Sequence, residues 1–319
     1  MGMANLGSMF DADDSGTFLG LPSATLADLQ GADVVVMGAP CATPYLSVGP
    51  YCKDAPAAIR AASSAYSRTR DHHNFDLGGP LMPEGTSAVD IGDVPWDDTA
   101  HDANRAAIRH SCEVVLAAGA VPIVLGGDDS IPIPVLQAYA DRSLTIVQID
   151  AHIDWRDEVR GERWGLSSTM RRASEMTQVG AMIQVGQRGV GSARPADLEA
   201  AHARGVHFFS ARDVHRGGIA QVLHHMPKGG DVFITIDVDG FDPTVVPGVL
   251  APEPGGLTYF QAIELIDGVA DRATIAGFDV VEFVPERDVN GLGALTTFRL
   301  TAHAIGRIAR QRASATATA

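Results

Sequence analysis

Apolar residues along the chain recur as short, β-branched runs that are separated by longer stretches with helical spacing. The runs predict eight strands, at 33–38, 88–91, 121–125, 144–150, 181–186, 206–209, 231–238 and 274–281. The longer stretches predict crossover helices at 55–66, 99–118, 195–203, 217–226 and 258–271, and a closing helix at 295–310. Strands joined by crossover helices form a largely parallel sheet that is covered on both faces, so the predicted fold class is α/β.

No linker or low-complexity stretch interrupts residues 31–310, which we predict to form one domain. Residues 1–30 are expected to be an N-terminal extension, and residues 311–319 a disordered tail. The chain has 319 residues, of which 45% are hydrophobic, and this is enough for a substantial core.

Polar side chains with an affinity for metals follow two of the predicted strands. The fourth strand runs into Asp150, His152 and Asp154, and an extended chain would point these alternate side chains the same way. The seventh strand brings Asp237 and Asp239 with the same spacing. If the two strands are neighbours, their ionised carboxylates repel one another strongly unless cations lie between them. The sequence therefore predicts a divalent metal site, with two ions.

The third predicted strand leads into Gly126-Gly127-Asp128-Asp129-Ser130. The adjacent glycines permit a sharp turn, and the acidic pair after them points to a cation. A phosphate cradle is the alternative for such a turn, but neither a Gly-x-Gly-x-x-Gly motif nor a Walker lysine follows. In open α/β sheets, ligands bind beyond the carboxyl ends of the strands, where all of these acidic residues lie.

Composition narrows the choice of partners and of compartment. The net charge of −15 and the absence of Lys or Arg clusters argue against nucleic acid or an anionic membrane, whereas a small cationic substrate would fit. No apolar stretch is long enough to span a bilayer. Cys41, Cys52 and Cys112 form no paired framework, which is typical of a reducing compartment, so we expect a cytoplasmic protein.

The chain resembles the ureohydrolase superfamily of arginases and agmatinases, and is more similar to the agmatinases. The resemblance covers nearly the whole length and rests on five motifs, at 126–130, 150–154, 236–243, 252–258 and 277–282. It implies a three-layer α/β/α sandwich with an eight-stranded, mainly parallel sheet. It also implies a hydrolase acting on C–N bonds in linear amidines, which converts a guanidino compound to urea and an amine through a metal-bridging hydroxide.

The resemblance further implies which residues form the site. The expected metal ligands are Asp129, Asp150, His152, Asp154, Asp237 and Asp239. Asp154 would also act in catalysis, and Glu282 would pair with the substrate guanidinium. Two divalent ions are implied, with Mn²⁺ expected and Ni²⁺ or Co²⁺ as alternatives. Relatives assemble as trimers or hexamers, so a homo-oligomer is expected.

Three departures from the family pattern suggest a divergent branch with an altered substrate or an impaired site. Asp129 stands where relatives have a histidine, no histidine lies near Leu166, and residues 38–42 lack an aspartate that is common in relatives.

Three hypotheses about function remain. The chain hydrolyses an agmatine-like compound, a guanidino acid or a substituted guanidine; or it is a metal-binding, catalytically silent subunit that assembles with an active ureohydrolase; or it is a related amide hydrolase, which this ligand set fits poorly.

Other residues have ordinary structural explanations. Trp155 and Trp164 flank the loop after Asp154, and either line a substrate pocket or only pack. Turn or helix-cap positions are expected for Asp128, Asp213, Asp242 and Asp279. Packing or surface positions are expected for the three cysteines and for His72, His73, His224 and His225.

Overall fold

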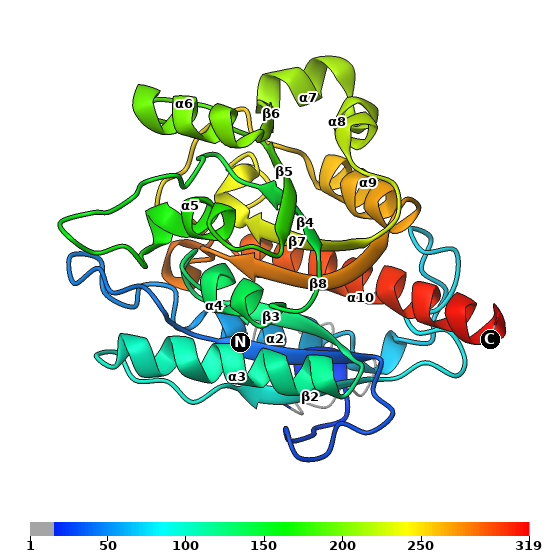
Figure 1. Cartoon of the computed structure of the whole chain (residues 1–319). Helices are drawn as coiled ribbons and strands as arrows, with labels where there is room; N and C mark the ends of the chain where they lie inside the picture. Colours follow the sequence, from blue (N-terminus) through cyan, green and yellow to red (C-terminus); the bar gives the residue numbers. More distant parts are fainter. Residues whose placement is uncertain (1–15, 319) are drawn as a thin grey trace.

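The computed structural model describes residues 16–318 (Figure 1). Eight strands form one sheet in the order β2-β1-β3-β8-β7-β4-β5-β6, and every neighbouring pair is parallel. The strands are β1 (Val34–Ala39), β2 (Ala88–Asp93), β3 (Val121–Gly126), β4 (Leu144–Ile149), β5 (Val179–Val185), β6 (His207–Phe209), β7 (Asp231–Asp237) and β8 (Thr274–Val281). All eight predicted strands are present, and the predicted fold class is confirmed.

Helices cover both faces of the sheet, which gives three layers (Figure 1). The helices on one face are α2 (Ala55–Ser64), α7 (Ala211–Gly217), α8 (Ile219–His225), α9 (Tyr259–Ala270) and α10 (Leu292–Thr318). Those on the other face are α3 (His101–Ala117), α4 (Pro132–Gln137), α5 (Thr169–Ser174) and α6 (Pro195–Arg204). Within the described part of the chain, no helix is both long and apolar enough to cross a membrane.

Two hydrophobic cores lie between these layers. Along β1, Val34 and Val36 belong to the core under α2 and α10, and Val35 and Met37 to the core under α3. Alternate side chains of a strand point to opposite faces, so a strand that is covered on both sides needs apolar residues throughout. This explains why the sequence shows continuous apolar runs rather than an apolar–polar alternation.

The helices differ from the prediction in two places. The short helices α4 and α5 were not predicted, because six residues are too few to show a helical period. The single helix expected at 217–226 is part of a pair, α7 and α8, which are separated at Gly218 with φ 72°. That left-handed conformation favours glycine and ends the first helix.

The predicted disordered tail is wrong for residues 311–318, because α10 continues to Thr318. The alanine-rich composition favours a helix. Gln311 also ties the start of this segment to α9 and β8: its side-chain amide donates to the carbonyl oxygens of Ala270 (2.8 Å) and Ala273 (2.7 Å), and its side-chain oxygen accepts from the backbone N–H of Ile275 (3.1 Å). Residues 1–15 of the predicted extension, and Ala319, lie outside the described residues.

A buried ion pair joins the sheet to α2. Asp90 on β2 is fully buried and accepts from Arg60 Nε (2.8 Å) and from Arg60 Nη2 (3.0 Å). The backbone N–H of Phe18 also donates to Asp90 (2.6 Å). Arg60 Nη1 also contacts the partly exposed Asp93 (2.5 Å), so Asp90 is the buried partner of Arg60 and depends on it for charge compensation.

We predict that Asp90→Asn lowers the free energy of unfolding by about 3 kcal/mol, because it leaves the buried Arg60 without its main partner. Glu113→Gln on α3 is the control, since its ion pair with Arg109 is solvent-exposed and should contribute less than about 1 kcal/mol. Urea denaturation of both variants measures the difference. Equal, small losses would show that the buried pair does not stabilise the fold.

Candidate metal centre

The acidic residues lie at the carboxyl ends of four neighbouring strands, β3, β8, β7 and β4. Parallel strands end at the same edge of a sheet, so residues that are far apart in sequence meet there. The side chains concerned are Asp129 after β3, Glu282 after β8, Asp237 and Asp239 at the end of β7, and Asp150, His152 and Asp154 after β4.

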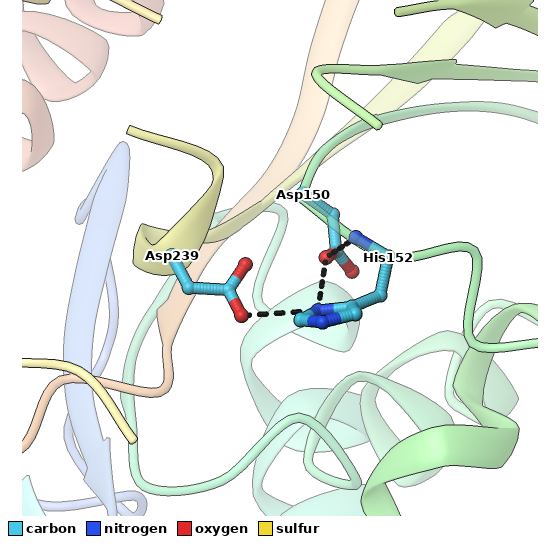
Figure 2. Close-up of side chains that lie close together, drawn as sticks. All are labelled: Asp150, His152 and Asp239. Atoms are coloured by element: carbon cyan, nitrogen blue, oxygen red, sulfur yellow. Dashed lines mark hydrogen bonds and ion pairs between the residues drawn. The ribbon is translucent and has the colours of Figure 1, made fainter. Parts of the chain in front are cut away.

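One potential set of metal ligands consists of Asp150, His152 and Asp239 (Figure 2). Their donor atoms all lie within 4.8 Å of one another. His152 Nδ1 is 3.1 Å from an oxygen of Asp239 and 3.5 Å from an oxygen of Asp150. Burial opposes the charged imidazole, but the hydrogen bond and the charge of Asp239 outweigh it and raise the pKa of His152 to about 9.

A second set consists of Asp129, Asp150 and Asp237, whose donor atoms also lie within 4.8 Å of one another. All three side chains are buried, and burial together with neighbouring carboxylates raises their pKa values well above the ordinary range. Asp150 belongs to both sets, as expected of a ligand that lies between two ions. The two sets therefore form one continuous cluster.

The cluster fits a pair of divalent cations. Both carboxylate oxygens of Asp129 are buried and have no hydrogen-bond partner among the described residues. Buried carboxylates are normally paired, hydrogen-bonded or bound to a metal. Oxygen-rich ligand sets with one imidazole suit first-row divalent cations.

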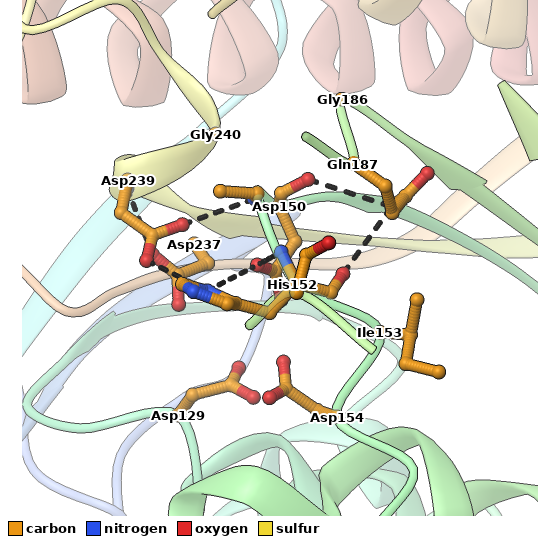
Figure 3. Close-up of polar contacts among 12 residues, drawn as sticks. Asp129, Asp150, His152, Ile153, Asp154, Gly186, Gln187, Asp237, Asp239 and Gly240 are labelled. Atoms are coloured by element: carbon orange, nitrogen blue, oxygen red, sulfur yellow. Dashed lines mark hydrogen bonds and ion pairs between the residues drawn. The ribbon is translucent and has the colours of Figure 1, made fainter. Parts of the chain in front are cut away.

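Asp154 lies opposite Asp129 (Figure 3). The spacing of Asp150, His152 and Asp154 predicts an extended strand up to Asp154, but β4 ends at Ile149 and the chain then leaves the strand conformation. Asp154 has a φ of 42° and Glu282 a φ of 68°, both in the left-handed region that residues other than glycine rarely adopt. Such strained backbone conformations are concentrated at functional sites.

Glu282 is fixed beside the cluster by two donors. The hydroxyl of Tyr51 lies 2.6 Å from each carboxylate oxygen, and the backbone N–H of Asp129 donates to one of them at 2.8 Å. Burial raises the pKa of Glu282 to about 8, although the hydrogen bond from Tyr51 acts against this. Glu282, Tyr51 and the cluster line one cavity of about 270 Å³.

The two tryptophans that flank the loop after Asp154 lie in different places. Trp155 is buried and lines this cavity. Trp164, proposed as a possible substrate contact, does not line this cavity: it lines a separate hollow on the surface, where its ring lies 5.9 Å from the guanidinium carbon of Arg105. The loop turns Trp164 outward onto α3.

The expected structural positions are largely confirmed. Asp128 and Asp242 accept backbone N–H groups in turns, and Asp213 completes a capping box on α7. The three cysteines are buried, and the four histidines are exposed. Asp279 is the exception: it is no cap, but lies fully buried within β8, where burial raises its pKa to about 8.

Three supporting residues were missed in the sequence. Gln148 on β4 donates to Asp150 (2.6 Å) and thereby orients that carboxylate. Tyr51 is separated from Glu282 by 231 positions, so no local pattern relates the two residues. Arg188 follows β5, and its guanidinium donates to the carbonyl oxygens of Gly186, Asp239, Gly240, Phe241 and Glu253.

Comparison with known proteins agrees with this fold and cluster. The model of the arginase family matches residues 32–311. The chain therefore belongs to the arginase family, and it is a hydrolase that acts on C–N bonds of amidino groups.

Its relatives include ureohydrolases with different names. The chain is 30% identical to an agmatinase of Pyrococcus horikoshii, over 89% of this chain and 94% of the relative. It is 31% identical to an N(1)-aminopropylagmatine ureohydrolase of Thermus thermophilus, over 88% and 92% of the two chains. The structure of a proclavaminate amidino hydrolase of Streptomyces clavuligerus superimposes with a TM-score of 0.80 at 28% identity, over 92% and 97%.

We predict that the metal-free protein becomes less stable as the pH rises from about 5 to about 8. Unfolded aspartates ionise near pH 4, whereas Asp129, Asp150 and Asp237 hold their protons to higher pH when folded. Over this interval the folded state binds more protons, so a rise in pH favours unfolding. Glu282, with a folded pKa of about 8, acts in the same direction.

Thermal melting of chelator-treated protein between pH 5 and pH 8 measures this dependence. Asp129→Asn should flatten it, because one of the raised pKa values is removed. A melting temperature that stays constant or rises over the interval would contradict the assignment of raised pKa values to the cluster.

We predict that Arg188→Met weakens metal retention about tenfold, as is typical when a group that orients a ligand is removed. Arg188 holds the backbone at Asp239, so its loss lets that carboxylate move. Metal content per chain after dialysis against a graded chelator series gives the measurement. Arg109→Met, an exposed change on α3, should retain metal like the wild type; equal retention by both variants would exclude this role for Arg188.

Proposed function

We propose that the chain is a metal-dependent hydrolase of a guanidino compound, which it converts to urea and an amine. The observation that carries this proposal is the position of Glu282, a carboxylate held by Tyr51 beside a buried cluster of aspartates within the same cavity. A guanidinium that pairs with Glu282 would present its central carbon to the cluster.

The relatives support the guanidino group as the shared part of the substrate. The names of the three relatives described above refer to agmatine, to N(1)-aminopropylagmatine and to proclavaminate. Their sequence identities to this chain fall within a few per cent of one another. Overall sequence similarity therefore supports hydrolysis of a guanidino group, but it does not identify the rest of the substrate molecule.

In this proposal the cluster would hold two divalent ions: one near Asp129, Asp150 and Asp237, and the other near Asp150, His152 and Asp239. By the family resemblance, Asp154 would complete the first site, and Asp150 and Asp237 would serve both. When bound, such ions supply Lewis acidity and lower the pKa of water into the neutral range. Mn²⁺ is the proposed metal, with Ni²⁺ and Co²⁺ as alternatives, because a set of five carboxylates and one imidazole favours harder cations.

The chain's own residues would bind, orient and move protons. Glu282 pairs with the guanidinium and fixes the plane of the group, while Tyr51 keeps the carboxylate in place. Asp154 orients the attacking water and accepts its proton. The water oxygen would bond to the guanidinium carbon, and the C–N bond to the substituted nitrogen would break. Both water protons would pass to the departing nitrogen, one through Asp154 and the other as the new hydroxyl becomes the carbonyl, leaving urea and an ammonium product.

A metal-binding, silent subunit is the second candidate. Leu166 lines the cavity at the place where the resembling family has a histidine that is a proposed proton carrier, so a donor is missing from the wall. Such a subunit would bind two ions without releasing urea until an active relative was added. A homo-oligomer, trimer or hexamer, remains a prediction from the resemblance.

We predict that protein reloaded with Mn²⁺, Ni²⁺ or Co²⁺ releases urea from at least one member of a panel of guanidino compounds. Asp154→Asn should lower the rate about 100-fold or more, because it removes the proton acceptor. Asp237→Asn should have a comparable effect and should also lower metal content, because it removes a shared ligand. Colorimetric urea assays and metal analysis give both quantities.

Asp213→Asn is the control, since Asp213 belongs to the capping box of α7 and does not line the cavity. It should leave the rate unchanged. Near-normal rates in Asp154→Asn and Asp237→Asn would refute the assigned roles. Two bound ions with no urea from any compound would favour the silent subunit.

A further inference from the structure

The cavity has a second charged region besides the acidic cluster and Glu282. Three further charged side chains line it, Arg156, Arg194 and Asp197. Arg194 and Asp197 pair with each other, with Nε–Oδ2 and Nη2–Oδ1 distances of 2.5 and 2.8 Å. Their charges therefore compensate each other, which leaves Arg156 to determine the sign of this part of the wall.

Arg156 has a charge without a partner. No hydrogen bond or ion pair involves its guanidinium among the described residues, although its side chain is only partly exposed. Arginine remains ionised at all physiological pH values, and its planar fork matches a carboxylate. Two other arginines of the same segment, Arg163 and Arg172, contact Asp157, whereas Arg160 is exposed and does not line the cavity.

The backbone around Arg156 is well fixed. The preceding residue, Trp155, is buried, and the backbone N–H of Arg156 donates to the carbonyl oxygen of Ser167 at 3.0 Å. Arg156 is two residues from Asp154, so their Cα atoms lie within about 7.6 Å of each other. Arg156 and the acidic cluster line the same cavity of about 270 Å³, so a positive charge lies on the wall of a cavity that suits only a small molecule.

We propose that the substrate is a short guanidino acid, with its guanidinium on Glu282 and its carboxylate on Arg156. This inference rests on the proposed function and adds the chemistry of the other end of the substrate. An amine tail, as in agmatine, would bring a second cation against Arg156, whereas a carboxylate would gain a charge-assisted hydrogen bond. Arg156 is thus a specificity-determining residue.

The test compares three substrates of similar length, which differ only in the group at the far end: 4-guanidinobutyrate, butylguanidine and agmatine. The metal-loaded wild type should hydrolyse the acid with the highest kcat/KM and agmatine with the lowest. Arg156→Gln should lower kcat/KM for the acid about 10- to 100-fold, mainly through KM, since one charge-assisted hydrogen bond is lost. Its kcat/KM for butylguanidine should stay within about twofold.

Two further variants test whether the charge of Arg156 determines the order of substrates. Arg156→Glu should reverse the preference, so that agmatine becomes a better substrate than the acid. Arg160→Gln, an exposed change in the same loop that does not line the cavity, should leave all three values as in the wild type. A folded Arg156→Gln variant that keeps the wild-type order of substrates would overturn the role of Arg156.

The two proposals fail in different ways. If the wild type releases urea from agmatine or butylguanidine in preference to the acid, the guanidino acid assignment is wrong and the proposed hydrolysis stands. If it releases urea from none of the three, nor from other guanidino compounds, the proposed function is wrong and the assignment falls with it.

Discussion

The mutual repulsion of buried carboxylates is the constraint on which this structure depends. Asp129, Asp150 and Asp237 lie within a few ångströms of one another (Figure 3), and burial, together with the charges of neighbouring carboxylates, raises the pKa of each well above its ordinary value. A chain without cations can keep this arrangement only by holding protons on these groups. Two divalent cations remove the need for those protons, and this is why the cluster is best understood as a metal site.

The fold provides what such a cluster needs. The four strands that end at the site are adjacent in the centre of an all-parallel sheet, where helices cover both faces and hold the strand ends in place. Supporting groups then fix individual side chains: Gln148 orients Asp150, Tyr51 orients Glu282, and Arg188 binds the backbone at Asp239. Catalytic geometry depends on such support as much as on the ligands themselves.

The sequence predicts the sheet and the metal-philic residues because both leave local patterns. Each buried strand is a continuous apolar run, and each acidic group follows such a run directly. Residues whose role arises from tertiary contact leave none. Tyr51 meets Glu282 across 231 positions, and Arg188 binds carbonyl oxygens up to 65 positions away, so neither could be found by spacing. The sequence left the role of Trp164 open between substrate contact and packing, because it does not show which way a loop turns.

Anomalous diffraction from crystals loaded with Mn²⁺ tests the central claim most directly. The account predicts two anomalous peaks, both within coordination distance of Asp150 and Asp237, with Asp129 at one peak and His152 at the other. One peak, or none, with Asp129, Asp150 and Asp237 still folded against one another, would contradict it.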